Sequence, residues 1–215
     1  METVVEVPIL SEILELVKDK VHPLKVKNVF VYGSRVYGSY RPESDFDIIL
    51  VAGAMLNHEE IKNEKYNIHI HTPDKFKADL LNYTMHCLEC FYAPEWARLR
   101  EKEKYVDFAI NVNKFKQSIL TQSSQTWTHA KYKFQTGDIH RGLKSGFHAI
   151  KALEFGLQIL DYGRINDFSS NNQLLEEIRS CEFYDWKPFK EKYLALKIEF
   201  EEKFKNHPGD FSKIE

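Results

Sequence analysis

The sequence predicts an α+β protein in which a half that mixes strands and helices precedes an all-helical half. Residues 1 to about 105 alternate short β-branched runs with short helical ones, whereas residues from about 107 to 205 follow helical spacing almost throughout. The charged stretch 98–104 separates these two regions of different pattern. We therefore expect two domains, 1–105 and 106–215, which suits a chain of 215 residues because domains commonly hold ~100–200 residues each.

The first half is expected to contain three strands between two helices. A helix should begin near Pro8, because proline suits a first helical turn, and should end at His22-Pro23. Runs of β-branched and aromatic residues predict the strands, and the strict alternation in the third of them indicates a half-exposed strand. The expected strands are 27–32, 46–51 and 66–71, and the second helix opens at Pro73.

The second half is expected to consist of helices joined by short turns. Apolar residues recur at helical spacing from Leu143 to Leu160, and Gly163 ends that helix. The turn before it contains Gly137 and the capping residue Asp138. The expected helices are 106–132 (as one helix or two), 139–162, 171–181 and 186–204.

The composition is that of an ordinary folded protein. Apolar residues make up 43% of the chain and charged residues 29%, which argues against disorder. A formal net charge of −2 excludes a strongly basic protein that coats nucleic acid, and no apolar run approaches the ~20 residues of a membrane span. The acidic start does not resemble a secretory signal, and three cysteines, an odd number, indicate a reducing compartment. We therefore expect a cytoplasmic protein that does not bind membranes.

The most informative stretch, residues 31–50, connects two of the apolar strands. The first strand ends at Gly33-Ser34, and the second opens with Asp45 and Asp47, which strand alternation puts on one face. Two neighbouring carboxylates repel each other unless a cation lies between them, and hard oxygen ligands suit Mg²⁺. Gly33 allows the backbone to approach a ligand closely, and Ser34 offers an N–H and a hydroxyl to a phosphate. The pattern therefore indicates phosphoryl or nucleotidyl transfer.

Gly33-Ser34-Arg35, followed by Ser44-Asp45-Phe46-Asp47, resembles the DNA-polymerase-β-like nucleotidyltransferases, in particular their small RlaP-like members. The resemblance is specific over about 28–52 and looser to about 100. It implies a small mixed β-sheet domain that carries the acids, followed by a helical domain that helps to bind the nucleotide or the acceptor. It also implies Mg²⁺, with Mn²⁺ as the alternative, at Asp45 and Asp47, and an NTP whose β,γ-phosphates contact Gly33, Ser34 and Arg35. The expected reaction moves a nucleoside monophosphate to a hydroxyl of an RNA end, a protein or a small molecule.

The family's third metal-binding carboxylate has no counterpart on the strand where it is expected. The site-facing residues of strand 66–71 are predicted to be Asn67, His69 and His71, and none is an acid. A histidine can act as a general base, and we take His69 as the candidate. Two hypotheses follow: an active enzyme in which His or Asn replaces one acid, or a nucleotide-binding, toxin–antitoxin-like module with impaired catalysis.

Basic residues on helix 139–162 are candidates for binding phosphate. Lys144, His148 and Lys151 lie on one helical stripe, which could hold an NTP or an RNA backbone and could equally be a solvated helix face. Arg141 and His148 also match the short Arg-x₄₋₆-His pattern of HEPN-type ribonucleases. Because that pattern is short, the ribonuclease hypothesis is the weakest of the three.

Two cysteines three residues apart raise the question of zinc. Cys87 and Cys90 lie next to His86, but a structural zinc site needs four ligands, and the remaining cysteine, Cys181, is far along the chain. We therefore interpret Cys87 and Cys90 as buried thiols on a helix.

Overall fold

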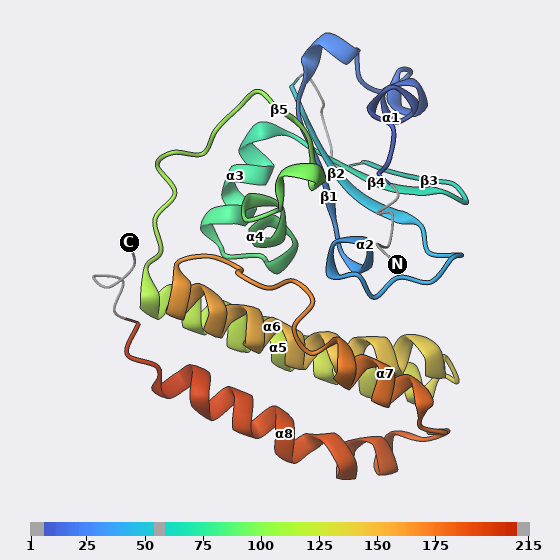
Figure 1. Ribbon diagram of the computed structural model, residues 1–215, viewed down its shortest axis with the longest axis vertical. Helices are drawn as coiled ribbons and strands as arrows, with labels where there is room; N and C mark the ends of the chain where they lie inside the picture. Colours follow the sequence, from blue (N-terminus) through green and yellow to red (C-terminus); the bar gives the residue numbers. More distant parts are fainter. Residues whose placement is uncertain (1–6, 54–58, 210–215) are drawn as a thin grey trace, which may run out of the picture. The chain divides into compact units, whose positions relative to one another are not determined.

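The computed structural model describes residues 7–53 and 59–209 and divides into two compact units (Figure 1). The sheet unit comprises Met1–Leu81 and His86–Phe108, and the helical unit comprises Asn82–Met85 and Ala109–Glu215. The short segment Asn82–Met85 thus interrupts the sheet unit in the sequence. The α+β class predicted from the sequence is confirmed, with a sheet-bearing unit and an all-helical one.

A mixed five-stranded sheet, in the order β3-β4-β2-β1-β5, forms the centre of the sheet unit. The central pair β2 and β4 is parallel, whereas the pairs β1–β2, β1–β5 and β3–β4 are antiparallel. The strands are β1 (Val26–Tyr32), β2 (Phe46–Ala52), β3 (Glu59–Lys62), β4 (Tyr66–His71) and β5 (Arg98–Glu101).

Three of these strands were predicted, and the two strands at the edges of the sheet were not. The edge strands β3 and β5 are four residues long and rich in charge, so they carry no apolar alternation that a sequence pattern could reveal. The charged stretch 98–104, expected to separate two domains, begins with β5, which pairs with β1, and the sheet unit ends at Phe108. Charge in this stretch therefore marks a sheet edge.

The two faces of the sheet have different roles. Helix α1 (Leu10–Val17) lies over one face (Figure 1). Its Ile13 and Val17 pack with the apolar side chains of β1, β2 and β4 in one buried cluster. Full burial of each such side chain stabilises the fold by roughly 1.5–3 kcal/mol. The opposite face packs against α3 (Pro73–Leu81), whose Phe76 stacks on Phe30 at a centroid distance of 5.7 Å.

The remaining short elements of the sheet unit connect the strands. Helix α1 ends at Val17, before the predicted end at His22, and His22 instead accepts a hydrogen bond from the N–H of Leu24. The connecting elements are η1 (Pro23–Lys25), α2 (Ser34–Tyr37), α4 (Met85–Phe91) and η2 (Glu95–Ala97).

Within residues 109–209, the helical unit has four helices, and capping residues set the ends of the two longest. The first begins at Val112 and not at the expected residue 106, because the Asn111 side chain caps it by accepting from the N–H of Lys114. Asp138 caps the second helix, and Gly163 in the left-handed conformation ends it. The helices are α5 (Val112–Gln135), α6 (Ile139–Tyr162), α7 (Asn172–Ser180) and α8 (Trp186–Asn206).

Candidate functional site

A glycine turn at the end of β1 brings the backbone against an acidic side chain. Gly33 has φ 76° and ψ −151°, a conformation that is essentially restricted to glycine. A Cβ atom at this position would lie 2.8 Å from Oδ2 of Asp47, closer than non-bonded atoms approach. Helix α2 begins at the next residue, Ser34, which is partly exposed. Glycine is therefore required here for backbone conformation and for the space next to the carboxylate.

The two acids of the motif lie at the start of β2. Phe46, between them, is buried in the core beneath α1, so the strand alternation turns Asp47 toward the opposite face. Asp47 pairs with Tyr32 of β1 in the sheet. Asp45 precedes the strand, and its carboxylate lies 3.2 Å from the ammonium of Lys62, so a cation already compensates this acid.

The neighbour of Asp47 on β4 is Asn67. Parallel pairing aligns Asp47 with Asn67, and the amide Nδ2 of Asn67 donates to Asp47 Oδ1 at 3.1 Å. This hydrogen bond fixes the amide orientation, because a carboxylate can only accept. The Oδ1 atom of Asn67 is buried and has no hydrogen-bond partner among the residues that the structure describes. The residue beside the acid thus offers an additional oxygen atom.

The two histidines of β4 share the face of Asn67 but lie further along the strand. His69 pairs with Ile49, about 7 Å beyond Asn67, and its ring centroid is 6.5 Å from that of Tyr32. His71 is buried and faces Asp79 of α3. The three residues predicted to face the site therefore do share one face, and Asn67 is the one that contacts Asp47.

A buried glutamate outside the sequence motif holds the Gly33 turn in place by hydrogen bonds. Glu89 of α4 is 5% exposed and accepts hydrogen bonds from Tyr37 Oη at 2.6 Å and from the N–H of Gly33 at 3.4 Å. Burial raises the pKa of the Tyr37 phenol, and the charge of Glu89 raises it further, so this hydroxyl stays a donor. One carboxylate thus holds both α2 and the glycine turn. An acid inside the otherwise apolar run 87–91 was the available signal.

The side chain of Arg35 contacts the loop that joins α2 to β2. Its side chain is buried, Nη2 donates to the carbonyl of Ser44 at 2.5 Å, and the guanidinium lies over the rings of Tyr40 and Phe46 at 4.4 and 4.2 Å. These contacts hold the loop in front of Asp45. They favour a positioning role for Arg35 over a direct contact with phosphate.

The candidate basic residues of α6 differ in exposure. Lys144 is exposed, whereas Lys151 is 2% exposed and its ammonium donates to the carbonyls of Phe168 and Ser170 at 3.0 and 2.8 Å. Lys151 therefore anchors the segment before α7 and does not belong to a solvated basic stripe. Both lysines lie in the helical unit, whereas Asp45 and Asp47 lie in the sheet unit.

His148 is partly buried, which bears on the ribonuclease hypothesis. Burial lowers its pKa to about 3, and the charges of Lys144, Lys151 and Arg179 contribute. An imidazole with this pKa is neutral near pH 7 and cannot donate a proton to a leaving group. Arg141 is well exposed and lies 3.6 Å from Asp138. The lowered pKa therefore does not favour His148 as a general acid in RNA cleavage.

The match to a family model agrees with the motif. The family model described as "Nucleotidyltransferase domain" matches residues 10–121, which is just over half of the chain. Among solved structures, a nucleotidyltransferase-like protein from Exiguobacterium sibiricum matches with a TM-score of 0.31 and 11% identity, covering 91% of this chain and 71% of that one. No curated protein matches. None of the helices within 7–53 and 59–209 has the length and apolar character that crossing a membrane requires.

Proposed function

Because the chain belongs to the family of nucleotidyltransferase domains, we propose that it transfers a nucleoside monophosphate from an NTP to an acceptor hydroxyl. The acceptor class is an RNA end, a protein or a small molecule. The proposal is supported above all by one observation, namely that Asp47 lies between the Gly33 turn and Asn67 on the polar face of the sheet. This arrangement joins an acid to backbone that a phosphate can approach.

The donor atoms at the beginning of strands β2 and β4 fit a hard divalent cation. Asp45 and Asp47 would hold Mg²⁺, or Mn²⁺ in its place, because carboxylate oxygens are the ligands that these ions prefer. The buried Oδ1 of Asn67 adds a neutral oxygen where the family has a further acid. When bound, the ion supplies positive charge that stabilises the attacking and leaving oxygens.

The chain itself would position the reactants. Gly33 allows the NTP phosphates to approach the backbone, and Ser34 offers a hydroxyl and an N–H. Asn67 orients Asp47, and Glu89 together with Tyr37 holds the turn in place. His69 is our candidate for accepting the proton of the acceptor hydroxyl.

We assign roles to the basic side chains according to their exposure to solvent and their contacts. Arg35 would position the loop before Asp45. Lys144, exposed on α6, remains a candidate for contact with the nucleotide or the acceptor. We leave Lys151 out of this role, because its ammonium is held by two backbone carbonyls.

Transfer is tested by incubating the full chain with α-labelled NTPs, Mg²⁺ or Mn²⁺, and RNA, protein and small hydroxyl acceptors. We expect pyrophosphate release that a chelator abolishes and that Asp45→Asn lowers at least about tenfold, because half of the metal-binding charge is lost. The matched control is Asp19→Asn, an exposed acid remote in sequence from the motif. Absence of pyrophosphate release under all these conditions would contradict the proposal, whether or not NTP binds.

A second candidate function, nucleotide binding without efficient transfer, is favoured by the amide at position 67. In that case Asn67→Asp should raise Mn²⁺-dependent pyrophosphate release at least about tenfold, since it puts a third carboxylate beside Asp47. Without metal, the same change should lower the free energy of unfolding by about 1 kcal/mol, because two carboxylates then lie in contact.

The control for this substitution is Asn63→Asp. Asn63 Oδ1 accepts from the N–H groups of Lys65 and Tyr66, and an aspartate can accept the same hydrogen bonds with the same added charge. If Asn67→Asp and Asn63→Asp have equal effects on metal-dependent activity, Asn67 does not lie at the metal site. If the wild type already turns over and Asn67→Asp slows it, the impaired-module hypothesis is wrong.

A further inference from the structure

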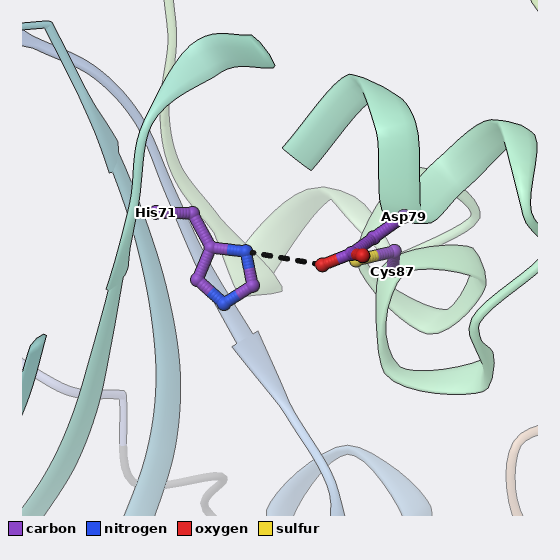
Figure 2. A group of neighbouring side chains, drawn as sticks. All are labelled: His71, Asp79 and Cys87. Carbon is purple, nitrogen blue, oxygen red and sulfur yellow. Dashed lines mark ion pairs between the residues drawn. The ribbon is translucent and has the colours of Figure 1, made fainter. Parts of the chain in front are cut away.

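A histidine, an aspartate and a cysteine from three different elements meet inside the sheet unit. His71 ends β4, Asp79 lies on α3 and Cys87 on α4, and Figure 2 shows the three side chains directed at one another. One ligand atom from each (a ring nitrogen, a carboxylate oxygen and the thiol sulfur) lies within 4.8 Å of the other two. His71 and Cys87 are buried, and the Asp79 side chain is 14% exposed.

The distance between the nitrogen and oxygen atoms is close to one edge of a tetrahedral zinc site. Zn²⁺ binds nitrogen and oxygen at about 2.0–2.2 Å, so two such ligands of a tetrahedron lie roughly 3.4 Å apart. Nδ1 of His71 lies 3.7 Å from Oδ2 of Asp79, which is too long for a hydrogen bond and close to that edge. The two atoms are therefore spaced as two ligands of one ion would be.

The chemical types of the ligands select among metals. Imidazole nitrogen and thiolate sulfur suit Zn²⁺, whereas Mg²⁺ requires oxygen ligands. Lys75 also contacts both carboxylate oxygens of Asp79, at 2.5 and 2.6 Å, and its ammonium extends from an exposed side chain. Lys75 compensates the charge of Asp79. The Cys87 sulfur and the His71 ring nitrogen still lie next to the Asp79 carboxylate.

We propose that His71, Asp79 and Cys87 bind one Zn²⁺ ion, with a water molecule as the fourth ligand. The thiol proton passes to solvent when the ion binds, since the ligand is the thiolate. The site is distinct from the acids of β2, because His71 lies four residues, about 13 Å, beyond Asn67 along β4. A bound ion would join α3 and α4 to the strand that carries Asn67.

The experiment strips the full chain with a chelator and titrates it with Zn²⁺ against a competing colorimetric chelator. We expect one ion per chain with submicromolar affinity and a rise in the melting temperature. Substitution with Co²⁺ should produce a tetrahedral spectrum with a thiolate-to-metal charge-transfer band. Asp47→Asn should keep that band, which separates this site from the proposed catalytic one. A wild-type chain with neither zinc binding nor a charge-transfer band overturns the proposal, whatever the variants do.

Matched variants identify the ligands. Cys87→Ser should lower zinc affinity at least about a hundredfold and abolish the charge-transfer band. Cys90→Ala is the control, because Cys90 is an equally buried thiol three residues along the same helix and lies outside the cluster. Loss of the band in Cys90→Ala, or its survival in Cys87→Ser, would overturn the ligand assignment. His86→Ala should leave the zinc affinity unchanged, because the proposed fourth ligand is water. A tenfold loss of zinc affinity in this variant would overturn the assignment of water and would indicate His86 as the fourth ligand.

Discussion

Replacing Asp47 by asparagine is expected to lower the rate of pyrophosphate release about a thousandfold and to leave the protein folded. The rate should fall because the substitution removes a charged ligand of the proposed metal ion, and losing one preorganised electrostatic contact at the reacting phosphate costs roughly 10²–10³ in rate. Loss of affinity for the metal should add to this effect. The measurement is initial-rate pyrophosphate release with saturating NTP and Mg²⁺.

The fold should survive this substitution because asparagine has the shape of aspartate. Its Oδ1 atom can still accept from Asn67 Nδ2, so the free energy of unfolding should change by less than about 1 kcal/mol. Asp19→Asn serves as the control for the loss of one negative charge. An Asp47→Asn variant with more than a tenth of the wild-type rate would mean that Asp47 does not hold the metal.

Replacing Gly33 by alanine is expected to damage both stability and activity. Alanine in this conformation is strained by roughly 1–3 kcal/mol, and its Cβ would lie 2.8 Å from Asp47 Oδ2. The turn and the carboxylate must move apart, so we expect a loss of about 2–4 kcal/mol in the free energy of unfolding and of at least about a hundredfold in rate. Urea denaturation and the pyrophosphate assay measure the two effects.

Gly38→Ala separates strain from contact with the acid. Gly38 also has a positive φ, 71°, but a Cβ there meets nothing within 4 Å. We expect this control to cost about 1–2 kcal/mol through backbone strain and to keep most of the activity. Equal losses of activity in Gly33→Ala and Gly38→Ala would show that the space beside Asp47 is not what the glycine provides.

The elements with a strong periodic signal could be predicted from the sequence. The apolar runs of β1 and β2 and the helical spacing of α6 gave correct elements, because burial imposes a period on each. For helix α4, the prediction that Cys87 and Cys90 are buried thiols on a helix was correct, but the bounds of the helix were not predicted, since its seven residues mix thiols, a glutamate and a histidine without a clear apolar stripe. The charged edge strand β5 was not predicted for a similar reason.

Only the residues of the candidate site that lie close together in the sequence could be predicted. Gly33, Asp45 and Asp47 form a contiguous motif, whereas the choice between Asn67 and His69 depends on the register of β4 against β2. A register is a long-range property, and residues 67 and 69 share one face, so alternation alone cannot distinguish them. The same limit hid the neighbours of Cys87. The sequence directed attention to Cys90 and His86, while the fold brings His71 and Asp79 to the thiol.

The segment Asn82–Met85 has a consequence for dissecting this protein. Although it lies between two parts of the sheet unit, it is tied to α5, where the Gln122 side chain bonds the carbonyl of Tyr83 and the N–H of Met85. Truncation after Phe108 would remove Gln122 and leave these groups exposed in the middle of the remaining fragment. The sheet-bearing portion therefore cannot be isolated by a single cleavage, and biochemical study requires the intact polypeptide.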